Sequence, residues 1–158
     1  MRIRKIFWLY LFLLLVDMLV IFTFSAQSAK SSSKLSKDIT SNVIEHTVGV
    51  NEDKTKAAFQ SYYTEIAVRK SAHAILFAIL GVTMMLSLKS AGFIKNKWWL
   101  LCVSFVLCIL YAISDEYHQT FIYGRSGSVS DVLIDSAGSL LGVVLVGLSS
   151  NKFSFGIK

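Results

Sequence analysis

The sequence predicts an all-α integral membrane protein that crosses the membrane four times. Of its 158 residues, 54% are hydrophobic and only 16% are charged. The mean hydropathy is +0.58, a value typical of membrane proteins rather than soluble domains. The apolar residues are concentrated in four runs, each close to the ~20 residues that a helix needs to cross a bilayer. We expect a single membrane domain that covers residues 1–158.

The four runs, in order, are residues 6–24, 71–88, 98–114 and 129–148. Basic residues precede the first run and small residues follow it, as in a secretory signal peptide. However, the first run has about 19 residues, whereas the apolar part of a signal peptide has ~7–15. We therefore predict that the first run is retained as a spanning helix.

The distribution of lysine and arginine predicts the orientation. The N-terminus carries three basic residues, segment 89–97 carries three and the C-terminal tail carries two, and none of these segments contains an acid. The positive-inside rule therefore places both termini on the cytoplasmic side of the cell membrane. Segment 25–70, with seven basic and five acidic residues, does not follow the rule, but long segments contribute less to orientation.

Segment 25–70 also has patterns of helical structure. Apolar residues recur at helical spacing, first at Leu35, Ile39 and Val43 and then at Ala58, Phe59, Tyr62, Tyr63 and Ile66. The second group has polar residues on its opposite face, which is typical of an amphipathic helix. We expect an amphipathic helical segment on the outer face, which either lies in the headgroup plane or caps the bundle.

Polar side chains gather at the predicted outer ends of all four spans, whereas the cytoplasmic ends carry only scattered lysine and arginine. The outer polar residues are Ser25, Gln27 and Ser28, then Arg69, Lys70 and His73, then Asp115, Glu116, His118 and Gln119, and finally Arg125, Asp131 and Asp135. So many polar groups at one membrane surface predict an organised site. Lys70 lies where the positive-inside rule disfavours it, so we expect a carboxylate partner for it.

The position of Asp135 strengthens this prediction. It lies about six residues inside the fourth run, or ~9 Å along a helix, and a carboxylate at that depth faces protein or water and often marks function. Asp131, Asp135, Gly138 and Gly142 share one stripe, and the two glycines form a GxxxG pattern, which favours close helix contact. We expect this stripe to face the bundle interior, and a homo-oligomer through the Gly138/Gly142 face is a further expectation.

On the third run, Glu116 and Gln119 share a face with Ala112. We expect this face to point inward, with Asp115 and His118 on a neighbouring face in supporting roles. Asp17, in the middle of the first run, is expected to pair with a serine or threonine across the bundle, and no role is assigned to it.

Each of these residues also has an ordinary structural explanation. Asp131 fits the first turn of a helix, where an acid stabilises the helix dipole. His118 fits an interfacial ring, and His73 a hydrogen-bonded residue between helices. Arg125, flanked by glycines, fits a turn with a solvated charge. Their joint occurrence at one surface favours a site.

Other functional classes receive no support from the sequence. Neither a zinc finger nor a basic helix is present, so we expect no nucleic-acid partner. Cys102 and Cys108 are six residues apart and would point to different sides of a helix, so we expect small buried side chains rather than a disulfide or a metal pair. No histidine, cysteine or acid spacing is diagnostic of a metal site, and we expect no metal and no cofactor.

Three blocks of the sequence resemble the VanZ-like membrane proteins, a family named after an accessory factor in resistance to teicoplanin-type glycopeptides. The blocks are FSAQSAKSSSKLS, RKSAHAILFAILG and SDEYHQTFIYGRSGSVSDVLIDSAGSLLG. The family pattern falls on Ser25, Gln27, Lys70, His73, Glu116, Gln119, Arg125, Asp131, Asp135, Gly138 and Gly142. Many relatives have asparagine at the position of Asp135, so the resemblance implies no obligatory charge there. It also implies no particular reaction.

The resemblance and the polar surface together support one main hypothesis. The protein lowers susceptibility to lipid-tailed glycopeptides by acting on the outer leaflet, with a membrane lipid or a lipid-linked cell-wall precursor as its partner. The candidate ligand-binding residues are Gln27, Lys70, His73, Glu116, Gln119, Arg125, Asp131 and Asp135.

Two alternatives remain open at this point. The first is a membrane enzyme acting on a lipid-linked or phosphate-bearing headgroup, with Glu116 as general base, His73 or His118 as acid or base, and Lys70 and Arg125 holding the anion. A metal-dependent variant of it would use Glu116, His118, Asp131 and Asp135. The second alternative is an ion-coupled transporter that uses Asp17 and Asp135, although the sequence shows neither broken helices nor an inverted repeat.

Overall fold

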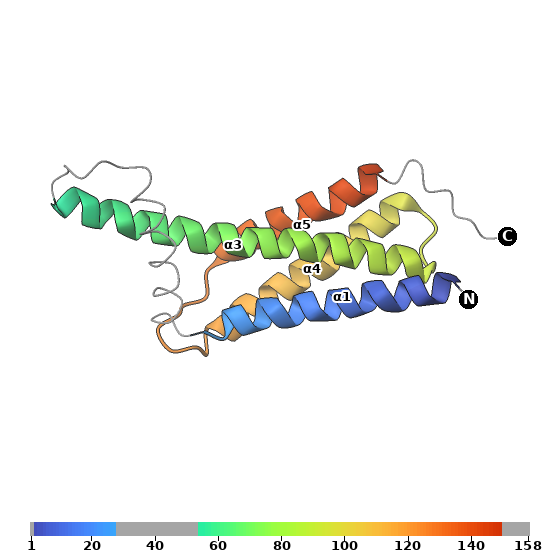
Figure 1. Ribbon diagram of the computed structural model, residues 1–158, viewed down its shortest axis with the longest axis horizontal. Helices are drawn as coiled ribbons and strands as arrows, with labels where there is room; N and C mark the ends of the chain where they lie inside the picture. The colour runs from blue at the N-terminus through green and yellow to red at the C-terminus, as the bar shows by residue number, and fades with distance from the viewer. Residues whose placement is uncertain (1, 28–53, 150–158) are drawn as a thin grey trace.

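The computed structural model describes residues 2–27 and 54–149, and within them it contains four helices and no strand. The helices are α1 (Arg2–Ser25), α3 (Lys54–Ala91), α4 (Lys97–Gln119) and α5 (Val129–Ser149) (Figure 1). Each contains a stretch long and apolar enough to cross a membrane: Lys5–Ser25, Ile66–Ala91, Lys97–Gln119 and Val129–Ser149. The predicted all-α architecture with four membrane-spanning helices is confirmed.

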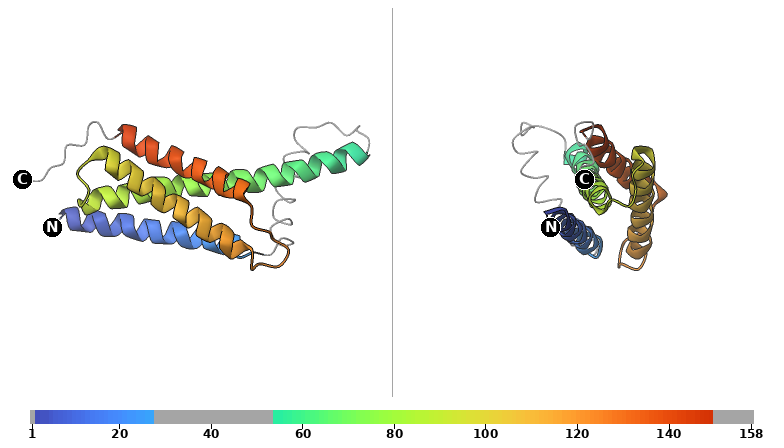
Figure 2. Two further views of the ribbon diagram at one scale, coloured as in Figure 1. Left: turned by 180° about the vertical axis from the view of Figure 1, so that it is seen from behind. Right: turned by 90° about the vertical axis from the view of Figure 1, so that its right-hand side faces the viewer.

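Helix α3 is the centre of the bundle. It packs against α1, α4 and α5, most extensively against α5, while α4 also contacts α5 and, over a smaller area, α1. The start of α1, the loop between α3 and α4 and the end of α5 lie at one end of the bundle (Figures 1 and 2). The end of α1 and the loop between α4 and α5 lie at the other, and this second end is called the polar end below.

All four helices are longer than the apolar runs from which they were predicted, and α3 and α4 exceed them most. Helix α3 begins at Lys54, so the segment around residues 58–66 is helical and continues into the second span without a break, extending past the bundle (Figure 1). The pattern at residues 35–43 lies outside the described residues. Helix α4 continues to Gln119, so the polar residues that follow the third apolar run belong to its last turns rather than to a loop.

Glycines bring α3 and α5 into direct backbone contact. A Cβ atom added at Gly138 would collide with the carbonyl of Ala74, and one at Gly142 would collide with the carbonyl of Ala78. A Cβ atom added at Gly81 of α3 would likewise collide with the backbone carbonyl of Ser139 in α5. The GxxxG stripe therefore faces the interior, as predicted. In the single chain described, α3 covers this face, and the expected homo-oligomer stays a prediction.

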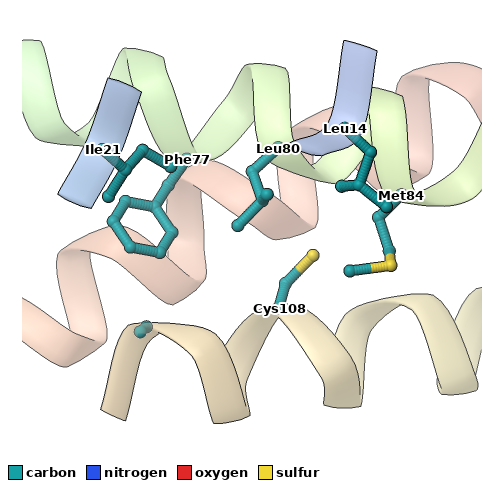
Figure 3. Packing of buried hydrophobic residues seen from close by; sticks show 7 residues of the cluster. Leu14, Ile21, Phe77, Leu80, Met84 and Cys108 are labelled. Atoms are coloured by element: carbon teal, nitrogen blue, oxygen red, sulfur yellow. The ribbon is translucent and has the colours of Figure 1, made fainter. Parts of the chain in front are cut away.

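The apolar core joins α1, α3 and α4. Its buried residues, shown in Figure 3, are Leu14, Ile21, Phe77, Leu80, Met84, Cys108 and Ala112. Asp17 is also buried in the span and accepts a hydrogen bond from the hydroxyl of Thr83 at 3.3 Å, the kind of partner expected for it. Cys108 is buried as predicted, but Cys102 is exposed, because its side of α4 faces away from the other helices.

Candidate functional site: a polar cavity at one end of the bundle

A cavity of about 160 Å³ lies at the polar end, between α3, α4, α5 and the loop that joins α4 to α5. It is lined by Arg69, Lys70, His73, Glu116, Gln119, Gly124, Arg125, Ser126, Ser128, Asp131, Ile134 and Asp135. Seven of the eight predicted ligand-binding residues therefore line one space. The exception is Gln27, which lies just beyond the end of α1 and does not reach the cavity.

Lys70 and Asp131 form an ion pair at the edge of the cavity. Lys70 Nζ lies 2.5 Å from Asp131 Oδ1, and about a third of each side chain is exposed (33% and 31%). Asp131 also stands in the first turn of α5, where its charge complements the helix dipole. The carboxylate partner predicted for Lys70 is thus present, and the pair joins the second span to the fourth.

Asp115 is the centre of a hydrogen-bonded chain that joins α1, α4 and the α4–α5 loop. Its Oδ2 accepts hydrogen bonds from Ser25 Oγ at 2.7 Å and from Gln119 Nε2 at 3.0 Å. Arg125 Nη1 in turn donates to Gln119 Oε1 at 2.9 Å. Asp115 is only 4% exposed, so it is buried together with Glu116 and Gln119 rather than lying on a separate face, and its supporting role stays a prediction.

The sequence contained a signal for this result. The buried side of α4 runs through Ser104, Cys108 and Ala112, and one further turn falls between residues 115 and 116. Both Asp115 and Glu116 are therefore buried, together with Gln119. The inward direction predicted for Glu116 and Gln119 agrees with the structure.

Glu116 holds the loop that closes the cavity. Its Oε1 accepts a hydrogen bond of 2.7 Å from the backbone N–H of Ser128, directly before the start of α5. Gly124 in the same loop has a φ of +79°, which a residue with a side chain adopts only rarely. The loop thus has a backbone conformation at Gly124 that favours glycine, and it is tied to α4 through Glu116.

His73 and Asp135 face each other across α3 and α5. His73 Nδ1 lies 3.8 Å from Asp135 Oδ2, too far for a hydrogen bond. Asp135 is 2% exposed, and its other oxygen, Oδ1, is buried with no hydrogen-bond partner among the described residues. The prediction that Asp135 faces the interior agrees with the structure, and His73 lies within reach of it.

His118 does not belong to this arrangement. It is absent from the residues that line the cavity, and its ring packs against Phe22 of α1 with 4.6 Å between ring centroids. A metal-dependent enzyme was expected to use Glu116, His118, Asp131 and Asp135. The structure does not bring these four residues together, because His118 lies outside the cavity. The group within metal-binding reach consists instead of His73, Asp115 and Asp135, whose ligand atoms lie within 4.8 Å of one another.

Arg69 and Arg125 supply positive charge to the same cavity. Burial lowers the pKa of the Arg125 guanidinium, and the nearby charge of Arg69 lowers this pKa further. The guanidinium remains charged near neutral pH, since its ordinary pKa is far above that range. Arg69 was noted at the outer end of the second span but not selected as a ligand-binding residue, although it directly precedes Lys70.

Comparison with known proteins assigns the chain to a family. The VanZ/LLP1 family model matches residues 7–150, a range that includes three of the apolar spans, nearly all of the first, and every residue that lines the cavity. The chain belongs to the VanZ/LLP1 family. This VanZ/LLP1 protein is a multi-pass membrane protein, given its four helices able to cross a membrane. A search of curated proteins and a search of solved structures each gave no match.

Proposed function

We propose that this VanZ/LLP1 protein binds the anionic headgroup of a membrane lipid or of a lipid-linked cell-wall precursor in its polar cavity. By doing so it lowers susceptibility to lipid-tailed glycopeptides of the teicoplanin type. The proposal places the polar end at the outer surface of the cell membrane and both termini in the cytoplasm. The basic residues of the N-terminus and of segment 89–97, at the opposite end, support this orientation through the positive-inside rule.

The pair of arginines in the cavity carries the proposal. Within the described parts of the chain, Arg125 Nε is buried without a hydrogen-bond partner, and the side chain of Arg69 forms neither a hydrogen bond nor an ion pair. A guanidinium has five N–H donors in a planar fork that matches phosphate and carboxylate groups. Because the two cations disfavour each other and retain unused donors, an anion bound between them would stabilise both.

Aromatic side chains around the polar end favour a lipid headgroup over a soluble anion. Tyr117, Phe121 and Tyr123 are 67%, 69% and 92% exposed. They belong to the last turns of α4 and to the loop beside the cavity. Aromatic rings prefer the headgroup level of a bilayer, so these residues would hold the cavity at the depth of lipid phosphates.

Antibiotic susceptibility tests the biological part of the proposal. Expression of the chain in a teicoplanin-susceptible host should raise the teicoplanin concentration needed to stop growth, and leave that of a glycopeptide without a lipid tail unchanged. The double variant R69A/R125A should lose this protection. Lys95→Ala, which removes an exposed cation at the opposite end, should keep it. An absence of protection by the wild-type chain, or full protection by the double variant at equal membrane abundance, would contradict the proposal.

Direct binding tests the chemical part. The full chain, purified in detergent, should bind a short-chain phosphatidic acid or phosphatidylglycerol more tightly than phosphatidylcholine of the same chain length. The double variant R69A/R125A should lose at least about tenfold of this affinity, a difference of about 1.4 kcal/mol. Equal affinity for anionic and zwitterionic lipids would show that the cavity does not select an anion.

A membrane enzyme acting on a phosphate-bearing headgroup is the alternative, because Glu116 and the His73–Asp135 pair line the same cavity. A carboxylate and an imidazole beside a bound anion are suited to general acid–base catalysis. Glu116→Gln separates the two functions, since the amide oxygen can still accept the hydrogen bond from Ser128 but the side chain can no longer take a proton. Headgroup binding predicts that this variant keeps its protection, whereas catalysis by Glu116 predicts complete loss in a folded protein.

A further inference from the structure

Three side chains of types that can bind a metal ion lie close together beside the cavity, and each comes from a different helix. His73 comes from α3, Asp115 from α4 and Asp135 from α5, and one ligand atom of each lies within 4.8 Å of the others. Both carboxylates are buried, with exposed fractions of 4% for Asp115 and 2% for Asp135. Two carboxylates placed so close in a medium of low dielectric repel each other unless a cation or a proton lies between them.

Among the described residues, no lysine or arginine forms an ion pair with Asp115 or Asp135, although the charge of Arg125 acts on Asp115 from a greater distance. Lys70 forms its ion pair with Asp131, and Arg125 donates to Gln119. Asp115 has two donors, Ser25 and Gln119, whereas Asp135 has none for its buried Oδ1. The His73 ring, 3.8 Å from Asp135 Oδ2, is the nearest group that could compensate the charge of Asp135. A buried carboxylate oxygen without a partner carries a free-energy cost that a bound cation would remove.

We propose that His73, Asp115 and Asp135 bind one divalent transition-metal cation of the Zn²⁺ or Mn²⁺ type. One imidazole nitrogen and two carboxylate oxygens form a mixed ligand set that suits these ions. Ca²⁺ prefers six to eight oxygen ligands, and Mg²⁺ binds through carboxylates and water rather than imidazole. Three protein ligands leave at least one coordination position open, on the side where His73 and Asp135 line the cavity.

The three ligand atoms, which lie within 4.8 Å of one another, must come closer together to hold the ion. Ligand atoms around a tetrahedral Zn²⁺ at ~2.1 Å are about 3.4 Å apart, compared with the 3.8 Å between His73 Nδ1 and Asp135 Oδ2. The difference is about 0.4 Å for this pair and at most about 1.4 Å for the pairs that include Asp115, a movement that side-chain rotation would have to supply. Ser25 and Gln119 would act as outer groups that orient the Asp115 carboxylate, as is usual around protein metal sites.

Metal titration of the full chain tests the inference. The protein, purified in detergent, treated with EDTA and carrying Cys102→Ser to remove its exposed thiol, is titrated with ZnCl₂, MnCl₂ and MgCl₂ by calorimetry. We expect one Zn²⁺ or Mn²⁺ per chain and at least about tenfold weaker Mg²⁺ binding. A carboxylate pair that shares a proton instead would give no saturable binding of Zn²⁺ or Mn²⁺, and that result overturns the inference whatever the variants do.

Single-residue variants test which side chains bind the ion. Asp135→Asn and His73→Gln should each weaken Zn²⁺ binding by ~10–100-fold or more, the range known for even the outer groups of metal sites. Asp17→Asn and His118→Gln remove a carboxylate and an imidazole outside the cluster and should bind like the parent. Size-exclusion chromatography establishes that each variant is folded. Unchanged affinity in folded Asp135→Asn would also overturn the inference.

The proposed metal site and the proposed anion-binding site can be tested separately with variants. R69A/R125A should lose anionic-lipid binding and keep one Zn²⁺ or Mn²⁺ per chain, whereas Asp135→Asn should lose the metal. As a measurement that needs no variant, Zn²⁺ should raise the thermal midpoint of the parent and EDTA should reverse the increase, because a ligand that binds only the folded state stabilises it. A thermal midpoint unaffected by saturating Zn²⁺ would contradict binding to the folded protein.

Discussion

Lys70 on α3 and Asp131 on α5 form an ion pair of 2.5 Å at the edge of the polar cavity. The pair is about one third exposed, so solvent screening limits its contribution to about 0.5–1 kcal/mol. Lys70→Met and Asp131→Asn should each lower the stability of the detergent-purified protein by about this amount. The double variant should be no less stable than the worse single one, because the interaction is lost only once. Thermal unfolding measures all three. Strictly additive losses would indicate that the two side chains act separately.

The hydrogen bond from Ser25 to Asp115 should contribute more to stability than the Lys70–Asp131 ion pair does, because both of its residues are buried. Ser25→Ala leaves a buried carboxylate with one donor fewer, and hydrogen bonds to charged groups contribute about 1.5–3 kcal/mol. The matched control is Ser114→Ala, whose hydroxyl donates to the backbone of Tyr111 on the exposed side of α4, and which should change stability by less than about 0.5 kcal/mol. Equal thermal midpoints for the two variants would contradict the central role of Asp115.

The glycines of α5 allow a graded test of the backbone contact with α3. A Cβ at Gly142 meets the backbone of α3, which cannot move aside, whereas a Cβ at Gly147 meets only the end of the Leu101 side chain. Gly142→Ala should therefore destabilise the protein by at least ~1–3 kcal/mol, the usual cost of overpacking. Gly147→Ala should cost clearly less. Folded yield and thermal midpoint of the two variants report the difference, and a larger loss for Gly147→Ala would contradict the packing described for α3 and α5.

The orientation of the protein can be read from two exposed aromatic positions. Tyr123 is 92% exposed at the polar end and Phe93 is 89% exposed at the other. In a Cys102→Ser background, Tyr123→Cys should react with a membrane-impermeant maleimide on intact cells. Phe93→Cys should react only after the cells are broken. The reverse pattern would place the polar cavity on the cytoplasmic side and exclude the proposed action on the outer leaflet.

The amino-acid pattern of single helices was enough to predict much of this structure. The apolar runs predicted the four spans, and the steps between Asp131, Asp135, Gly138 and Gly142 predicted the interior stripe of α5. The polar residues at one surface predicted that these side chains lie near one another, because helices of similar length that cross one membrane bring their ends on the same side together. The spans were predicted too short only where polar residues continue a helix, as at Asp115–Gln119 of α4.

Four details depended on how the helices cross. The periodicity of α4 points between Asp115 and Glu116 and singles out neither residue, and the crossing of the helices buries both. Likewise, Ser25 rather than Gln27 reaches the polar network, and α3 of the same chain covers the Gly138/Gly142 face. The grouping of His73 with Asp115 and Asp135 also depends on three helices at once. The sequence by itself determined the membrane class, the number of spans and the surface that carries the polar groups, because hydrophobicity and helical periodicity are properties of single segments. Only the tertiary structure decided which side chains touch, because that depends on the rotation and crossing of helices that are far apart in the chain.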